Sequence, residues 1–253
     1  MKHLETERQP NQPVFLQQSW QNVLFLNYAI QPEEIRPLLP DGLELDLYND
    51  SSAWVSIVPF QLKSKLPFLK TSFFNTWQWP IQLNELNVRT YVKVNGVAGI
   101  YFFSLDANDL CSVWAARTLF SLNYFNANIQ VNTLGQGQTE WLAERRHPGQ
   151  KKSRFRLKMK PGLAKISVNE GSLTDWLTSR WRFYAVNPKD KKTIICGTID
   201  HGPWPLYPAD IEILENTLLD DHSLPQPEQP ESVYFSPGVA VSAYWRQPLS
   251  KLS

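Results

Sequence analysis

The sequence predicts one β-rich domain with a few short helices, and three observations carry that prediction. A chain of 253 residues is long enough to bury a substantial core. Ten Trp and 13 Phe occur with 11 Gly and 19 Pro, a mixture typical of many strands with irregular connections. No linker or change in composition divides the chain, so we expect a single domain over residues 1–253, with residues 1–13 as a flexible N-terminal segment.

In the first third, a short helix is predicted over residues 32–40. Pro32 stands at its first position, and acidic residues follow in the first turn. Residues 61–83 are rich in Pro, Phe and Trp without a clear period, and we interpret them as a long loop over the surface or over a cavity mouth. Strands are predicted at 21–30, 43–48 and 53–60.

Two further helices are predicted in the remainder. The first covers residues 109–120 and is capped by Asn108. The second covers residues 172–182, where Ser172 and Asp175 resemble a capping box. Strands are predicted at 124–132, 154–160, 193–200, 209–216 and 239–245.

The most informative segment is a hairpin whose turn is Asn95-Gly96. This dipeptide favours a two-residue type I′ turn, and such a turn fixes the strand register. Carried along the hairpin, that register places Arg89 opposite Phe102, Asn87 opposite Ser104, and Glu85 opposite Asp106.

One face of this hairpin would then mix charged and apolar side chains. A face of that kind is typical of a lined cavity. It also occurs on a sheet that a helix covers through one buried ion pair, or on a solvent face with scattered apolar residues. The face consists of Glu85, Asn87, Arg89, Tyr91, Ile100, Phe102, Ser104 and Asp106.

Arginine also occurs on the predicted apolar faces of the two later helices. Arg117 falls in the stripe formed by Leu110, Val113, Trp114 and Phe120, and Arg180 has the same place in the later helix. A buried guanidinium is costly unless it finds an anion or several acceptors. Each arginine is therefore either a strut that pairs with a carboxylate or a contact for a ligand.

Acid and base candidates are few. Glu85 facing Asp106 would raise the pKa of one carboxyl unless a cation intervenes, and Arg89 or Arg117 could be that cation. His201, at a strand end before a turn, is either a structural hydrogen-bonding residue or a proton-transfer group.

Other classes of partner and cofactor have little support. A formal net charge of +1 and a basic stretch over 145–160 without stacking aromatics do not favour nucleic acid. The histidines lack metal-ligand spacing, no phosphate-binding glycine loop occurs, and no apolar run approaches a membrane span, so we expect no metal, no cofactor and no membrane. Cys111 and Cys196 lie in apolar segments, and two buried thiols fit the cytoplasm.

Six ordered segments resemble a known family. They are ELNVRTYV, GIYFFSLDA, the AR-x-x-F of Ala116 to Phe120, LNYFNANI, GSLTDWL, and the run from His201 through PWPL to Ala209. They are similar to the YqjF-like bacterial proteins, which are identified as members of the acetoacetate decarboxylase-like superfamily. The resemblance implies an α+β fold with an antiparallel, barrel-like sheet around a central cavity, in many members as homo-oligomers.

The same resemblance argues against decarboxylation through a Schiff base. Acetoacetate decarboxylase has a lysine pair that resembles the segment 121–125 here, and Tyr124 and Phe125 occupy the lysine positions. Neither side chain can condense with a ketone. Arg117 and Glu85 would match an upstream arginine and the active-site glutamate of the superfamily.

Two functions remain. In the first, the cavity binds a small polar or anionic organic molecule, with lyase- or hydratase-like acid-base chemistry as its enzymatic version. Its catalytic candidates are Glu85, Asp106, Tyr124 and His201, and its ligand-binding candidates are Asn87, Arg89, Phe102, Ser104, Arg117 and Trp204. In the second, the central charges are ion-pair struts of a non-catalytic protein, and Trp77, Trp79 and Trp204 recruit a partner.

Overall fold

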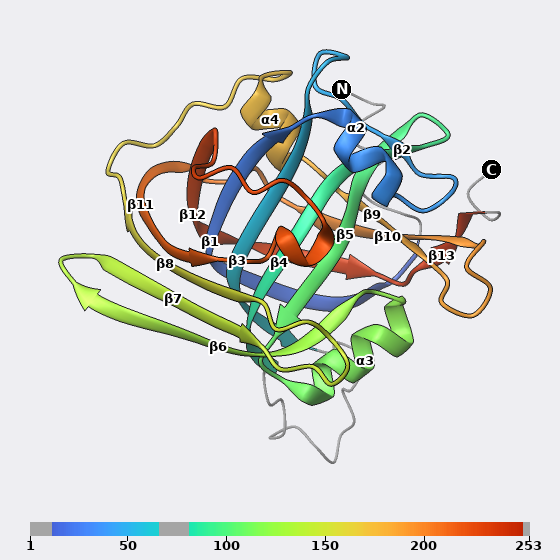
Figure 1. The fold of residues 1–253 in the computed structure, drawn as a ribbon, viewed down its shortest axis with the longest axis horizontal. Helices are drawn as coiled ribbons and strands as arrows, with labels where there is room; N and C mark the ends of the chain where they lie inside the picture. The colour runs from blue at the N-terminus through green and yellow to red at the C-terminus, as the bar shows by residue number, and fades with distance from the viewer. Residues whose placement is uncertain (1–11, 66–80, 250–253) are drawn as a thin grey trace.

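The computed structural model describes residues 12–65 and 81–249, and shows β-strands that wrap into a barrel with a few short helices at its periphery (Figure 1). The predicted flexible N-terminal segment, except its last two residues, lies outside the described residues, as do Trp77 and Trp79. The strands are β1 Val14–Ile30, β2 Glu44–Leu45, β3 Ala53–Lys65, β4 Ile81–Val94, β5 Val97–Ala107, β6 Tyr124–Gly135, β7 Gln138–Arg145, β8 Arg154–Pro161, β9 Arg182–Val186, β10 Ile194–His201, β11 Tyr207–Asn216, β12 Ser232–Tyr244 and β13 Gln247–Pro248. The helices are α2 Pro32–Ile35, η1 Arg36–Leu38, α3 Leu110–Phe120, α4 Leu173–Thr178 and η2 Asp220–His222.

Nine strands close a mixed barrel, and four further strands lie outside it, so the predicted barrel-like fold is confirmed. The ring runs β5-β6-β7-β8-β11-β12-β1-β3-β4 and returns to β5. Most neighbours are antiparallel, as predicted, but β5 pairs in parallel with β6 and with β9. The helix α3 is the crossover between β5 and β6, and a longer segment that includes β6, β7 and β8 separates β5 from β9, so both parallel pairs have the long connection that they need.

A second ring shares a wall with the first. β9 pairs with β5, β10 pairs with β9, and β10 also pairs with β12, which closes a smaller ring on the other face of β12-β1-β3-β4-β5. Because successive side chains of a strand point to opposite faces, each shared strand supplies both interiors. In β1, for example, Leu24 and Leu26 join the core of the nine-stranded barrel, whereas Val23 and Phe25 face the smaller ring.

The interior of the nine-stranded barrel is filled with side chains. Its core contains the fully buried Trp141, Phe155 and Leu157 from the strands β7 and β8. The loop that carries η2 adds Leu218 and Leu219 to the same core. This barrel is therefore a packed core, and the smaller ring is the compartment that has free space.

The predicted strands exist, although several bounds differ. Of the strand predicted at 43–48, only the two residues of β2 are in a strand. The loop predicted over 61–83 is strand at both of its described ends, because β3 continues to Lys65 and β4 begins at Ile81. The sequence patterns missed β7 and β9. The basic strand β8 is not an edge strand, since it pairs with both β7 and β11.

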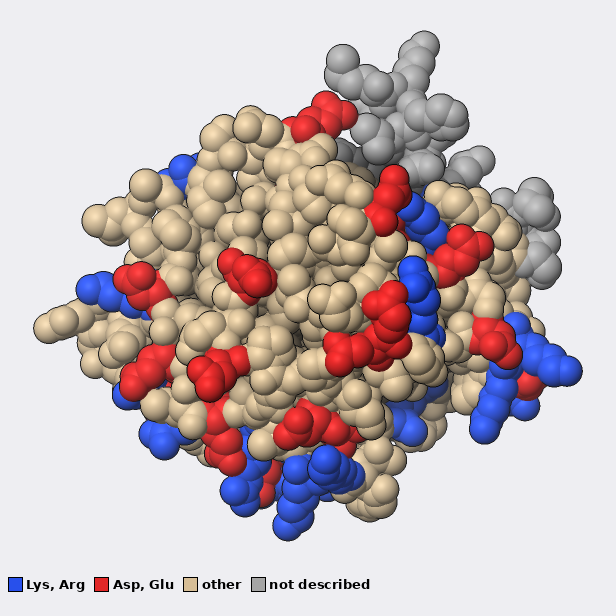
Figure 2. All heavy atoms as spheres, turned by 45° about the horizontal axis from the view of Figure 1, so that its top comes forward, with Lys and Arg blue, Asp and Glu red and all other residues tan. Residues whose placement is uncertain are grey.

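Charged side chains of both signs are interspersed on the face shown in Figure 2. On β8, Arg156 pairs with Glu140 and Lys158 pairs with Glu212. Of the two cysteines, Cys196 is buried as expected, but Cys111 is exposed, so that prediction was wrong. No helix among the described residues is long and apolar enough to cross a membrane.

Candidate functional site

The register of the β4–β5 hairpin changes along its length and decides which side chains enter the smaller ring. Near the turn the pairing is as predicted, with Val94 opposite Val97 and Arg89 opposite Phe102. A bulge between Val88 and Arg89 then shifts the register by one residue. A bulge places two residues of one strand opposite one residue of the other, and here the extra residue is in β5, so the residues of β5 beyond it change faces.

The predicted pair of Glu85 with Asp106 is therefore wrong. Beyond the bulge, Glu85 lies opposite Ala107, and Asp106 lies opposite Leu86. Glu85 keeps its place in the smaller ring, whereas Asp106 points into the nine-stranded barrel.

The smaller ring contains a partly open cavity of about 290 Å³. Strands β1, β3, β4, β5, β9 and β10 line it, together with one side of α3. Seven of the ten predicted site residues line this cavity: Glu85, Asn87, Arg89, Phe102, Tyr124, His201 and Trp204. None of the described lining residues is a lysine.

Glu85 and Tyr124 form a hydrogen-bonded acid-base pair. The Tyr124 hydroxyl donates to Glu85 Oε2 at 2.7 Å, and only 3% of Glu85 is exposed. Burial raises the pKa of Glu85 to about 7, against the opposing effect of its hydrogen bonds with Tyr124 and Asn87. The predicted carboxylate partner, Asp106, is only the smallest contributor to that shift. Burial and the neighbouring Glu85 raise the pKa of Tyr124 well above its ordinary value.

Arg89 is a buried cation in the cavity wall with no carboxylate partner among the described residues. Its Nη2 donates to the carbonyl of Leu177 at 3.3 Å, and its guanidinium lies 5.5 Å from the centre of the Phe25 ring. Its Nε has no hydrogen-bond partner in the described part of the chain. A buried donor without a partner costs free energy, which an anionic ligand would recover.

Arg180 brings a second guanidinium to the same cavity. Its Nη1 pairs with Asp46 Oδ2 at 2.7 Å, and its Nε donates to the carbonyl of Trp176. Of the two alternatives for Arg180, the strut that pairs with a carboxylate is therefore present. Its Nη2 is nevertheless buried without a partner in the described residues. Burial, and to a smaller extent Arg89, lower the pKa of Arg180, whereas Asp46 raises it.

His201 and Trp204 line another part of the wall. His201 is buried, and its Nδ1 lies 2.8 Å from the carbonyl oxygen of Gly202. Its ring is tilted by 53° to the ring of Trp204, with 4.9 Å between the ring centres. Trp204 Nε1 donates to the carbonyl of Thr178. The last residues of α4 thus accept hydrogen bonds from both Arg89 and Trp204, which fixes these two side chains.

Three predicted site residues lie elsewhere. Asp106 pairs with Arg145 in the nine-stranded barrel, through contacts of 2.7 and 2.9 Å. Ser104 is buried there too and lies 2.9 Å from His222 Nε2. Both changed faces at the bulge, which no turn or periodicity signal in the sequence reveals.

Arg117 is exposed and does not line the cavity. Its Nη1 donates to the carbonyl of Tyr124. The predicted apolar stripe of α3 is wrong in two of its four residues, because Trp114 is 70% exposed and Leu110 is 66% exposed, whereas Val113 is buried and Phe120 lines the cavity. The N-cap is Asp109, whose side chain accepts from Ser112 N, rather than Asn108.

Sequence reasoning missed Arg182, Phe183 and the apolar residues of β1 and β3. These side chains enter the cavity because β9 and β10 close the smaller ring. Arg182 lies two residues after Arg180, at the last position of the helix predicted over residues 172–182. The strand β9 was missed because its five residues show no clear alternation of polar and apolar side chains.

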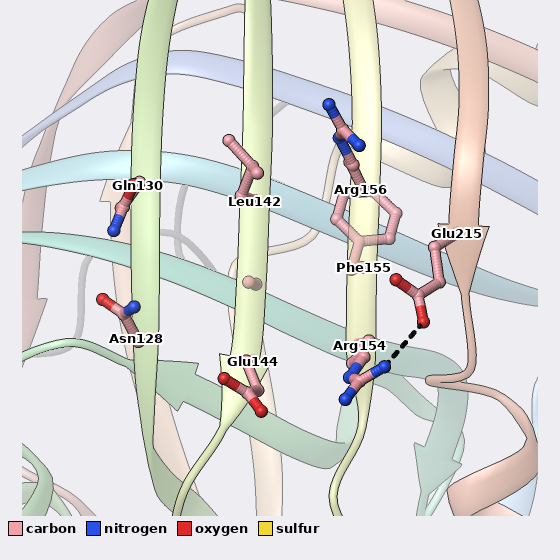
Figure 3. A pocket seen from close by; sticks show the side chains of 9 residues that line it. Asn128, Gln130, Leu142, Glu144, Arg154, Phe155, Arg156 and Glu215 are labelled. Atoms are coloured by element: carbon pink, nitrogen blue, oxygen red, sulfur yellow. Dashed lines mark ion pairs between the residues drawn. The ribbon is translucent and has the colours of Figure 1, made fainter.

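A second hollow of about 280 Å³ lies on the outer side of β6, β7 and β8 (Figure 3). Its polar side chains are largely exposed, and its cations have acidic partners. Arg154 lies 3.6 Å from Glu215, as the dashed line in Figure 3 marks, and Arg156 pairs with Glu140. The cavity of the smaller ring is therefore the stronger candidate site, because its cation Arg89 is buried and lacks such a partner.

Comparison with known proteins agrees with this architecture. Residues 17–240 match the family DUF2071, described as "Uncharacterized conserved protein (COG2071)". The chain is 34% identical over 238 residues to "Uncharacterized protein YqjF" of Bacillus subtilis (strain 168), which covers 94% of this chain and 93% of that protein. The chain belongs to the DUF2071 family.

Solved structures with the same fold are acetoacetate decarboxylase-like. The enduracididine biosynthesis enzyme MppR, in complex with pyruvate, superposes with a TM-score of 0.64 at 13% identity, over 96% of this chain and 93% of that chain. Acetoacetate decarboxylase from Legionella pneumophila gives a TM-score of 0.63 at 9% identity, over 97% and 94% of the two chains. At these identities the likeness establishes the fold alone.

Proposed function

We propose that this DUF2071 protein binds a small organic carboxylate in the cavity of its smaller ring and catalyses acid-base chemistry on it. The observation that carries the proposal is Arg89, a buried guanidinium that lacks a described carboxylate partner and faces a cavity. Arg180 adds a second unpartnered donor. Arginine donors suit a carboxylate because they match both of its oxygens. Pyruvate, bound by the structurally similar MppR, is a ligand of this chemistry.

Glu85 supplies the proposed chemistry. A carboxyl whose pKa is about 7 exists in both protonation states near neutral pH, so it can accept a proton from a ligand and return it. Tyr124 holds the Glu85 carboxyl in place through its hydrogen bond. This arrangement supports lyase- or hydratase-like proton transfer beside a carbonyl group, without a Schiff base.

The alternative, in which central charges only hold the fold together, fits a different group of residues. Arg145 is 1% exposed in its side chain and pairs with both Asp106 and Asp221 in the filled barrel. That network has its acids and its base in contact, as a strut requires. Arg89 has no such acidic partner among the described residues, and this difference favours a ligand at Arg89.

Ligand binding is tested by thermal unfolding and calorimetry with pyruvate, acetoacetate and other small carboxylates. We expect a carboxylate to raise the melting temperature of the wild type and of the control Arg117→Gln, whose arginine is exposed. Arg89→Met should abolish the rise because the guanidinium is lost, with an effect of about 2–5 kcal/mol on binding, the usual range for a buried charge pair that loses one partner. Equal binding by Arg89→Met and the wild type would contradict the proposal.

Proton transfer is tested by the exchange of pyruvate methyl protons with deuterium, followed by NMR. The wild type should accelerate this exchange, and Glu85→Gln should reduce the rate about 100-fold or more, the usual contribution of a general base. Calorimetry should still detect the binding of pyruvate to the same variant, since Arg89 is intact. An unchanged exchange rate in Glu85→Gln would exclude Glu85 as the base.

A further inference from the structure

The composition of the cavity wall limits the kind of carboxylate that fits. Apart from its arginines and the Glu85–Tyr124 pair, the wall is mainly aromatic and aliphatic, with Phe25, Val58, Phe60, Phe102, Phe183 and Trp204 among its residues. A polar metabolite that carries charged groups at both ends would place one of them against this apolar wall, at a desolvation cost.

The aromatic rings follow one another away from the carboxylate site. The Arg89 guanidinium lies 5.5 Å from the Phe25 ring centre, and Phe25 lies 5.1 Å edge-to-face from Trp204. Trp204 in turn lies 6.2 Å from Trp20, which is 5.1 Å from Phe60. A flat ring attached to the carboxylate end of a ligand would therefore meet aromatic partners directly beside its charge.

The volume sets the size of the ligand. A cavity of about 290 Å³ corresponds to about ten water molecules at their liquid volume of about 30 Å³ each. Because bonded atoms pack more closely than separate waters, a ligand of about a dozen non-hydrogen atoms would fill it. Pyruvate has about half that number and would leave much of the apolar wall without contact.

Resting on the proposed function, we infer that the ligand is an aryl-substituted oxo acid of about the size of phenylpyruvate. Its carboxylate lies at Arg89, its ring lies against Phe25 and Trp204, and its acidic carbon is available to Glu85. The deprotonation of that carbon transfers one proton to Glu85 and leaves an enolate, and the reverse step returns the proton, so the exchange is balanced without an oxidant or a further reactant.

The test is a series of ligands measured by calorimetry with the full chain: pyruvate, 4-methyl-2-oxopentanoate, phenylpyruvate, indole-3-pyruvate and the uncharged methyl ester of phenylpyruvate. Each further buried carbon should add up to about fourfold in affinity, so we expect phenylpyruvate to bind at least about tenfold more tightly than pyruvate. The larger indole-3-pyruvate and the uncharged ester should bind at least about tenfold more weakly than phenylpyruvate.

A cavity-filling variant separates size from charge. Ala116 lines the cavity from α3, and Ala116→Leu is compatible with a helix while it reduces the free volume. We expect this variant to lose about tenfold more affinity for phenylpyruvate than for pyruvate, and a cooperative urea unfolding transition like that of the wild type shows that it is folded. Equal losses for both ligands would overturn the inferred fit.

The outcomes distinguish the two proposals. If pyruvate binds through Arg89 but phenylpyruvate binds no more tightly, the aryl class is wrong and the carboxylate site remains. If no member of the series binds, or if all bind equally well to Arg89→Met, the carboxylate site is wrong and the inferred class is wrong with it.

Discussion

Glu85 combines a buried position with hydrogen-bond donors that only partly compensate for lost solvation. Its pKa of about 7 in the folded protein compares with an ordinary value of 4.5. Between these values the folded state keeps a proton that the unfolded chain has released. The contribution of Glu85 to the free energy of unfolding therefore falls as the pH rises through this window and is constant above about pH 7.

The substitution Glu85→Gln should remove this dependence. The difference between 4.5 and 7 corresponds to about 3 kcal/mol, so the variant should gain about that much relative to the wild type between about pH 5 and about pH 8. Urea unfolding of the variant and of the wild type at both pH values measures this gain in the free energy of unfolding. Tyr124→Phe removes a donor that lowers the pKa of Glu85, and it should move the window upward. Parallel profiles for all three proteins would show that Glu85 is not perturbed.

At the level of the element, the bulge in the β4–β5 hairpin separates the two interiors. The turn Asn95-Gly96 and the register next to it were predicted correctly, because a two-residue turn determines its neighbours. The pairing beyond the bulge was wrong, since a single extra residue leaves no local signal and its cause is long-range. Asp106 finds Arg145, and Ser104 finds His222, only when the barrel has closed.

Arg145 offers a test of the structural role of the displaced residues. Arg145→Met leaves Asp106 buried without its partner, so we expect a loss of about 3–5 kcal/mol in the free energy of unfolding. Arg156→Met breaks the half-exposed pair with Glu140 on the next strand and should cost less than about 1 kcal/mol. Urea unfolding of both variants at neutral pH decides this. Similar costs for the two would mean that Asp106 and Arg145 are not a buried strut.

At the level of the whole molecule, strands from both ends of the chain close the two rings. β1 pairs with β12, and β10 pairs with β12 as well. Alternating patterns predicted most of these strands, and the family resemblance supplied the barrel. The individual strand partners depend on contacts between distant segments, which explains why Arg182 and Phe183 were missed while Arg89 and Phe102, close to a definite turn, were found.

The two interiors should respond to pH in opposite directions. Burial, followed by the nearby Arg145, lowers the pKa of His222 to about 4 in the nine-stranded barrel. A histidine with a depressed pKa stabilises the fold above its ordinary value of 6.5, and that contribution is lost as the pH falls towards 4. Glu85 has the opposite dependence over nearly the same range.

These two groups should therefore nearly cancel in the wild type between about pH 4.5 and about pH 6.5. Glu85→Gln should show stability that rises with pH relative to the wild type, and His222→Gln should show stability that falls. Each slope should amount to about 2–3 kcal/mol across the window, as measured by urea unfolding. Slopes of the same sign in both variants would rule out this compensation.

The bulge between Val88 and Arg89 also affects how related sequences should be read. On the turn side, even-numbered positions of β5 such as Ile100 and Phe102 face the cavity, but past the irregularity the odd-numbered Leu105 does so. An alignment that assumes unbroken alternation would assign Asp106 to the wrong chamber in every family member that keeps the extra residue. Comparisons of ligand preference between family members should therefore take the even-numbered positions of β5 as cavity-facing on the turn side of the bulge, and the odd-numbered positions as cavity-facing beyond it.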